Sequence, residues 1–299
     1  MIRLRRARSR DTGFQASTFE LREADTVRWQ RQQRAGRRWA VWGAVLGVAG
    51  ALVSLAPAQW LAAGLQQATG GRLLLAEARG SVWNGSAVVV LTGGEGSRDA
   101  AALPGRLNWR LRPDWRGLQL RASQACCLQG EVRLHLQPGW AGYTATLDTP
   151  ADASGTLGRW PAAWLAGLGT PWNTLQLGGQ LQLASGGLRL QSTEGRLQFE
   201  GTLALTLQSA SSRVSPLPVL GSYLLQVQGS GTGAGNAVPT VQLSTLDGVL
   251  VLSGNGQWTG SRLRFRGQAE AAEGHAAALS NLLNIIGRRQ GALSVISIG

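Results

Sequence analysis

Short alternating segments separated by glycine decide what most of this chain can fold into. After about residue 60, apolar residues recur at every second position, in segments spaced roughly eight to twelve residues apart. Such alternation predicts antiparallel strands with one apolar face and one polar face, here of Gln, Arg, Ser and Thr. The clearest segments are Leu107-Trp109-Leu111, Val132-Leu134-Leu136, Leu181-Leu183, Leu188-Leu190, Leu197-Phe199, Leu203-Leu205-Leu207 and Val241-Leu243. Turns are expected at the glycine-rich links, including Ser185-Gly186-Gly187 and Glu194-Gly195-Arg196.

A shared P-x-x-W-L pattern predicts two short helices. It begins at Pro57 and again at Pro161, and glycine follows each stretch. Proline suits the first turn of a helix and glycine suits its end. The repeated pattern, followed each time by strands, suggests a duplicated unit with halves 59–158 and 159–299.

A third helix is predicted within residues 275–289. One apolar stripe recurs there at spacings of i, i+3, i+4 and i+7, which is typical of a helix packed on one face. The stripe comprises Leu279, Leu282, Leu283 and Ile286. Arg288 and Arg289 are expected at the end of this helix, where positive charge complements the helix dipole.

The run from Trp39 to Ala56 carries no charge. As a helix it would be about 27 Å long, enough to cross the apolar core of a bilayer. Residues 39–58 are therefore predicted to form an uncleaved transmembrane anchor, with indoles at both membrane interfaces. The marker residues of this anchor are Trp39, Trp42, Leu46, Val53 and Trp60.

The charges before this run predict its orientation. Residues 1–38 hold eleven arginines against four acids, a formal charge of +7. By the positive-inside rule this leader is expected in the cytosol, and residues 59–299 are expected to form a β-rich domain on the far side of the membrane. The absence of lysine, with abundant arginine, alanine and glycine, indicates a bacterium with GC-rich DNA, so the far side is expected to be the periplasm. A competing interpretation is a cleavage site at Ala56-Pro57-Ala58, which would remove residues 1–58 as a signal peptide.

Composition removes most catalytic chemistry. All 29 basic residues are arginine, so no lysine is present for a phosphate loop or a Schiff base. Two His and two Cys leave no spare donors for a zinc or His-rich metal centre. No G-x-S-x-G motif occurs, and the acids after the anchor are scattered singly. We expect no enzyme activity, no cofactor, no metal and no small-molecule substrate, and we interpret the arginine-rich leader as a topology signal rather than a nucleic-acid site.

The adjacent residues Cys126 and Cys127 leave several states open in an oxidising compartment. They could form a vicinal disulfide, bridge to a partner or remain small buried thiols. Neighbours on a strand face opposite sides, which argues against a bond between them. The expectation is therefore two buried thiols.

The letters G-x-x-W-x-G predict two tight hairpins. One contains Trp83 and Gly85, and a related one contains Gly256, Trp258 and Gly260. Each tryptophan is expected to cap the core of the sheet. The alternative hypothesis is that it stacks on a carbohydrate ligand.

The second half of the chain resembles the type II secretion system protein N family. The matching runs are VSPLPVLGSYLLQVQG (214–229), VQLSTLDGVLVLSGNGQWTGSRLRFRGQAEA (241–271) and LSNLLNIIGRRQGALSVISIG (279–299). GSVWNG at 80–85 and the span at 39–58 fit as well, so the resemblance covers about residues 39–299. The residues that carry it are Trp83, Gly85, Leu220, Gly221, Tyr223, Gly256, Trp258, Gly260, Phe265, Gly267, Gly287, Arg288, Arg289 and Gly291. Val219 departs from the family, where a proline is expected before Leu220.

The resemblance implies an inner-membrane component of the machinery that exports folded periplasmic proteins. Its partners would be other platform subunits and membrane lipid, and the family assigns no catalytic residue. On physical grounds, strands with free edges suit a tethered scaffold or adaptor, for which the family-signature residues would serve architecture.

A second hypothesis is an AsmA-like lipid-handling protein with an apolar groove. It depends on whether helices cover the apolar face formed by residues such as Leu181, Leu183, Leu203 and Leu205.

Overall fold

The computed structural model describes residues 39–140, 142–148, 155–193, 196–229, 238–259 and 262–299. The chain forms two compact units, Met1–Leu55 and Ala56–Gly299. In the first unit, residues 39–54 form a helix whose side chains are exposed. Among the described residues, no helix combines the length and the hydropathy that a membrane crossing requires. The expected leader over residues 1–38 lies outside the described residues.

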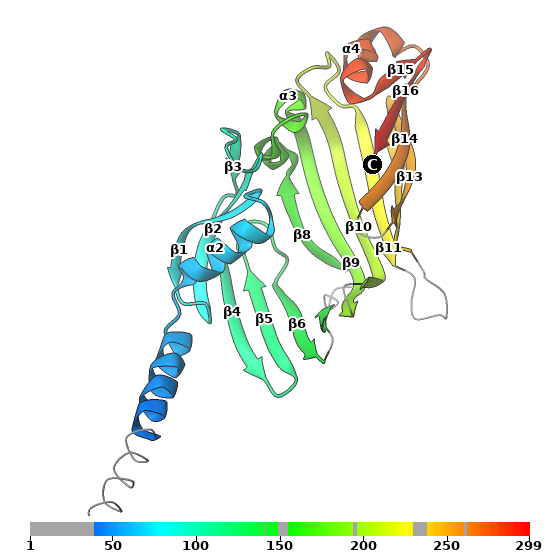
Figure 1. The fold of residues 1–299 in the computed structure, drawn as a ribbon. Coiled ribbons are helices and arrows are strands. Elements are labelled where there is room, and N and C mark those ends of the chain that lie inside the picture. Colours follow the sequence, from blue (N-terminus) through cyan, green and yellow to red (C-terminus); the bar gives the residue numbers. More distant parts are fainter. Residues whose placement is uncertain (1–38, 141, 149–154, 194–195, 230–237, 260–261) are drawn as a thin grey trace, which may run out of the picture. The chain divides into compact units, whose positions relative to one another are not determined.

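The second unit is built almost entirely from strands (Figure 1). Its first eight are β1 (Leu73–Gly80), β2 (Asn84–Thr92), β3 (Ala100–Ala102), β4 (Leu107–Asp114), β5 (Gly117–Ser123), β6 (Glu131–Gly139), β7 (Gly142–Leu147) and β8 (Thr156–Pro161). The others are β9 (Leu177–Thr193), β10 (Arg196–Ser212), β11 (Gly221–Gly229), β12 (Thr240–Gly248), β13 (Leu250–Thr259), β14 (Arg262–Ala271), β15 (Arg288–Gln290) and β16 (Leu293–Ile298).

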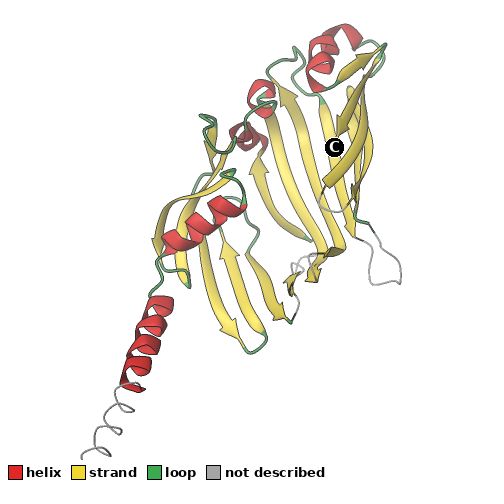
Figure 2. Ribbon diagram, viewed as in Figure 1, coloured by secondary structure: helices red, strands yellow, loops and turns green. Residues whose placement is uncertain are grey.

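All sixteen described strands belong to one sheet, whose order is almost the order of the sequence. The path runs β1-β2-β4-β5-β6-β7-β9-β10-β11-β12-β13-β14-β16-β15, with β3 on β2 and β8 on β9. Figure 2 shows this sheet as one strand layer with the helices at its ends and along one rim. The expected mainly β, antiparallel fold is confirmed.

One expected turn is not a turn. Ser185-Gly186-Gly187 lies inside the 17-residue strand β9, and Leu197-Phe199 and Leu203-Leu205-Leu207 are both parts of β10. The β9–β10 register shifts between Gly201 and Leu203, which marks a bulge opposite the Ser-Gly-Gly segment. Glycine is needed there because a Cβ on Gly201 (φ +112°) would collide with the carbonyl oxygen of Gly187. The glycines therefore bend the strands instead of ending them.

The helices are α2 (Ala58–Ala68), the 3-10 helix η1 (Ala162–Leu168), α3 (Trp172–Leu175) and α4 (Ala276–Ile286). The predicted helix starts are confirmed, because Pro57 and Pro161 directly precede α2 and η1. The predicted end of the last helix is wrong. Arg288 and Arg289 lie in the strand β15, because Gly287 has extended backbone and ends α4 before them.

Helices cover the apolar face of the sheet in three separate places. Leu279, Leu282 and Leu283 of α4 are buried against β10, β11, β13 and β14. Ala58 of α2 packs on β2 and β4, and Trp164 of η1 packs beside β2 and β4. The predicted stripe of α4 is thereby confirmed. These three clusters lie at the two ends of the sheet and at one rim.

Cys126 and Cys127 form a vicinal disulfide, contrary to the expectation of two thiols. The two cysteines do not alternate as strand neighbours would, because residues 125–127 form a turn between β5 and β6. Cys127 is buried, and its carbonyl oxygen accepts a hydrogen bond from the Arg159 amide at 2.7 Å.

Candidate functional site

Two family-signature residues, Leu220 just before β11 and Tyr223 within it, belong to the core cluster beneath α4. Leu220 is buried, its amide donates to the carbonyl oxygen of Ala210 at 2.7 Å, and its own carbonyl oxygen accepts from the amides of Val249 and Leu250. The hydroxyl of Tyr223 donates to the carbonyl oxygen of Leu250 at 2.9 Å. These contacts hold the start of β11 against the start of β13, so Leu220 and Tyr223 have an architectural role.

Burial raises the pKa of the Tyr223 hydroxyl. The larger cause is desolvation, and the smaller one is the negative charge of the nearby Asp247 carboxylate. Above about pH 10 the unfolded chain therefore binds fewer protons than the folded chain, so the free energy of unfolding falls as the pH rises.

We expect urea unfolding of the full-length protein between pH 9 and 11 to show this loss. The slope should approach about 1.4 kcal/mol per pH unit above pH 10. Tyr223→Phe should be less sensitive to pH over that range, since the other tyrosine, Tyr143, is exposed and remains in both proteins. Equal slopes for the two proteins would contradict this role of Tyr223.

The second signature hairpin is built around one aromatic ring. Phe265 of β14 is buried, and its ring lies against the positions where Gly254, Gly256 and Gly267 would carry a Cβ, at 2.4, 3.0 and 2.9 Å. The glycines leave room for the ring to lie flat on the sheet, a device that stabilises glycine-containing strands. Trp258 is paired with Leu263 across the hairpin, and Gly260 lies outside the described residues.

The first hairpin uses the same device with a tryptophan that sequence reasoning did not single out. The indole of Trp109 lies where a Cβ on Gly85 would be, at 2.4 Å, and its nitrogen donates to the carbonyl oxygen of Val82 at 3.1 Å. Trp109 is buried, whereas Trp83 is partly exposed in the turn. Trp109, rather than Trp83, fills the core there. The alternation of Leu107, Trp109 and Leu111 places Trp109 on the apolar face, and this pattern could have identified it as a core residue.

Of the C-terminal signature residues, Gly287 is half-buried and the other three are exposed. A Cβ on Gly287 would lie 2.5 Å from the carbonyl oxygen of Val295, and Gly291 (φ +64°) turns the chain from β15 into β16. Arg288 and Arg289 are exposed on β15, the last strand of the path. Close packing accounts for Gly287 and the positive φ accounts for Gly291, whereas neither accounts for the two arginines.

The apolar face is continuous across the middle of the sheet. Its rows follow directly paired residues from strand to strand: Leu118, Leu136, Ala145, Leu190 and Phe199; Leu120, Leu134, Leu147 and Leu188; and Leu183, Leu205, Leu225 and Leu243. Leu181 is buried, but Leu183, Leu203 and Leu205 are partly exposed and lie outside the described core clusters that the helices cover. In the described part of the chain, helices therefore leave the middle of this face uncovered.

A groove of about 1200 Å³ lies beside these rows, where β7 ends and β8 begins. Val132, Leu147, Leu157 and Leu188 supply its apolar lining. Its charged lining is mixed in sign, with Arg133 and Arg189 beside Glu131, Asp148 and Glu200. Its volume exceeds the range of about 300–1,000 Å³ that is typical of small-molecule sites.

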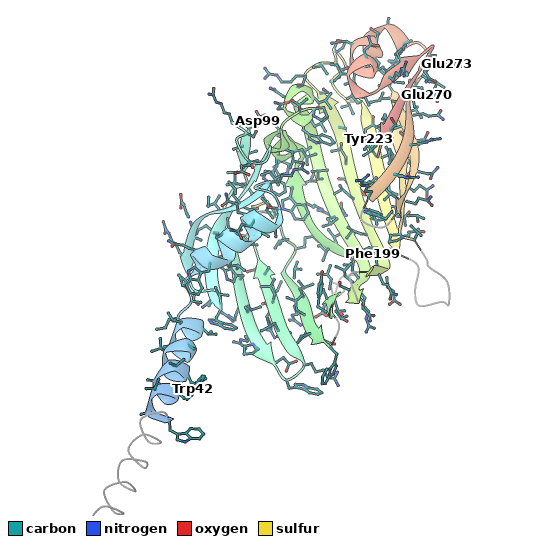
Figure 3. The ribbon with its side chains drawn as sticks, viewed as in Figure 1. Trp42, Asp99, Phe199, Tyr223, Glu270 and Glu273 are labelled. Atoms are coloured by element: carbon teal, nitrogen blue, oxygen red, sulfur yellow. A yellow bond between two sulfur atoms is a disulfide. The ribbon has the colours of Figure 1, made fainter. Side chains whose placement is uncertain are left out.

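The described residues show no group of three or more His, Cys, Asp and Glu side chains able to hold a metal. Two residues that line the groove form an ion pair, Arg133 Nε with Glu131 Oε1 at 3.1 Å. The marker residues of the expected anchor are all exposed, and Figure 3 shows Trp42 projecting from the N-terminal helix. Trp60 belongs to α2 in the second unit.

Comparison with known proteins identifies the chain through one family. The model for type II secretion system protein N matches residues 71–295, which include almost the whole sheet. Neither the curated proteins nor the solved structures provide a significant match. The match covers well over half of the chain and includes nearly all of the hairpin and turn residues described above. The chain therefore belongs to the type II secretion system protein N family, as a component of that secretion system.

Proposed function

We propose that this protein is a non-catalytic scaffold or adaptor of the inner-membrane assembly platform, tethered by the apolar helix of residues 39–54 with its sheet in the periplasm. The observation that carries the proposal is the family match together with a single open sheet. The tether would confine the sheet beside its partners and raise their effective concentration without requiring a tight interface.

The two ends of the sheet are the proposed docking edges. The path ends at β1 and β15, and neither has a second strand neighbour among the described residues. On β1 the regular register with β2 covers Leu73–Ala76 and then shifts, where Glu77 has φ +49°. On β15 the edge is short and carries Arg288 and Arg289, so it favours an acidic partner segment.

Site-specific photo-crosslinking in native membranes tests this proposal. A photoreactive residue in place of Leu74 or Arg289 is expected to crosslink other type II secretion subunits, which mass spectrometry would identify. Gln226, on the polar face of the central strand β11, is the matched control position and should give much weaker crosslinks. Deleting the gene should leave secreted proteins in the periplasm. Absence of secretion subunits among the crosslinks at both edges would contradict the proposal.

The second candidate function, a membrane-anchored lipid-handling protein, is supported by one observation. Leu183, Leu203 and Leu205 remain partly exposed and lie outside the helix-covered clusters. A scaffold does not require an uncovered apolar face, whereas a lipid-handling protein does.

A further inference from the structure

The hairpin turns at one end of the sheet carry exposed aromatic residues. Trp115 in the β4–β5 turn and Trp140 after β6 are exposed by 81% and 109%. The guanidinium of Arg116 lies 4.0 Å from the centre of the Trp115 ring. Tryptophan is usually buried, and exposed Trp and Arg together are typical of a surface that meets the headgroup region of a membrane.

The chain enters the sheet at the same end. The carbonyl oxygen of Ala56 accepts a hydrogen bond from the amide of Val82, in the turn between β1 and β2. That turn and the two tryptophan turns are on one end because β1, β4 and β6 all run toward it in the antiparallel order. The end with exposed tryptophans is therefore also the end at which Ala56, the first residue of the second unit, is held.

The uncovered apolar face suits an occupant without hydrogen-bonding groups along its length. The backbone groups in the middle of the sheet are used in pairing between strands, so the face itself offers leucine side chains and no backbone partners. An extended peptide laid on such a face would leave its own amides unpaired, which is unfavourable away from water. An acyl chain has no such groups.

The dimensions of the face also agree with an acyl chain. The row from Leu118 through Leu136, Ala145 and Leu190 to Phe199 crosses four interstrand spacings, roughly 19 Å. One leaflet of a bilayer core is about 15 Å thick, which is the reach of one lipid tail. The groove beside the row extends this apolar surface with Leu147, Leu157 and Leu188.

We propose that the uncovered middle of the apolar face, from β5 to β10, binds the acyl chains of membrane lipids that enter from the tryptophan-bearing end. This inference rests on the membrane attachment in the proposed function and adds a ligand that a scaffold alone does not need. Binding would cover leucines that the described helices leave partly exposed.

Photolabelling of the full-length protein tests the site. The protein is reconstituted in vesicles of phosphatidylethanolamine and phosphatidylglycerol that contain phosphatidylcholine with a diazirine in its acyl chain. Cleavage after arginine separates the relevant segments, because residues 117–121, 134–159 and 190–196 fall in different peptides. We expect labelling of these three peptides as well as of the N-terminal helix.

Leu136→Gln and His135→Gln form a matched pair, since they introduce the same side chain at adjacent positions of β6 that face opposite sides. Losing the burial of one leucine should lower labelling of peptide 134–159 by about tenfold in Leu136→Gln. His135→Gln should leave it unchanged. Trp115→Ser with Trp140→Ser should slow labelling of the face without changing labelling of the N-terminal helix, and it avoids substitutions in the sheet.

The outcomes separate this inference from the proposed function. Labelling confined to the N-terminal helix would overturn the acyl site and leave the anchor in place. Absence of label from both regions would overturn the site and the membrane tether together. A dimer whose sheet peptides are protected from the probe would overturn the acyl occupant in favour of a second copy of this chain.

Discussion

Phe265→Ala is expected to lower the free energy of unfolding of the full-length protein by about 3–5 kcal/mol. The ring is 94% buried on a bed of Gly254, Gly256 and Gly267, and glycines have no side chain with which to fill the space it leaves. The measurement is urea unfolding in detergent micelles, followed by tryptophan fluorescence.

Phe199→Ala is the matched control for the loss of a phenyl ring. Phe199 also lies over a glycine, Gly229, but it is partly exposed on the uncovered part of the face. Its removal should cost clearly less than removal of Phe265. Equal losses for the two substitutions would show that the three-glycine bed does not matter.

A double substitution isolates the contact between the ring and the glycine. A Cβ on Gly254 would lie 2.4 Å from Phe265 Cζ and 2.9 Å from the carbonyl oxygen of Arg266. Gly254→Ala should therefore cost about 1–3 kcal/mol through crowding. In the Phe265→Ala background the ring is gone, so the same change should cost less, with a coupling of about 0.5–3 kcal/mol. Additive losses would contradict direct contact.

The general architecture could be predicted from the sequence because each strand carries its own signal. The alternation in Leu107-Trp109-Leu111 or Val132-Leu134-Leu136 states which residues share a face, and antiparallel neighbours in a meander need no further information. The stripe of α4 is equally local. Both predictions depend on periodicity alone, and both are confirmed.

The predictions that the structure contradicts concern sequence patterns that are compatible with two different local structures. Ser185-Gly186-Gly187 is compatible with a turn or a bulge, and the choice depends on β10 continuing past it on the other side. Arg288 would favour the end of a helix, yet pairing with Val295 places it in a strand. The state of Cys126 and Cys127 depended on where β5 ends. These are facts about distant partners, which periodicity does not contain.

The candidate site shows the same division. The glycines and aromatics of the signature were recognised, but their reason, a ring lying flat on glycines from neighbouring strands, requires the register of β13 and β14. The importance of Trp109 was missed because its partner, Gly85, lies on another strand. The sequence does not predict whether the middle of the apolar face is exposed, because that depends on where α2, η1 and α4 pack.

Leu283→Ala is the second substitution with a large expected effect. Leu283 of α4 is fully buried against the sheet, and its carbonyl oxygen accepts a 2.6 Å hydrogen bond from the hydroxyl of the buried Ser294 on β16. Truncating it leaves a cavity between helix and sheet, so we expect a loss of about 2–5 kcal/mol in the free energy of unfolding. Ile285→Ala, two residues away on the same helix, is the control.

Ile285 is 36% exposed, so its truncation should cost much less than that of Leu283. Urea unfolding of both variants, with circular dichroism to follow the sheet, measures the difference. Because α4 holds one end of the apolar face, Leu283→Ala should also lower the urea midpoint without altering labelling of the central rows under native conditions. Equal destabilisation by the two substitutions would mean that α4 is not held by its buried stripe, and that the end of the sheet at β14 and β16 is stabilised by something other than this helix.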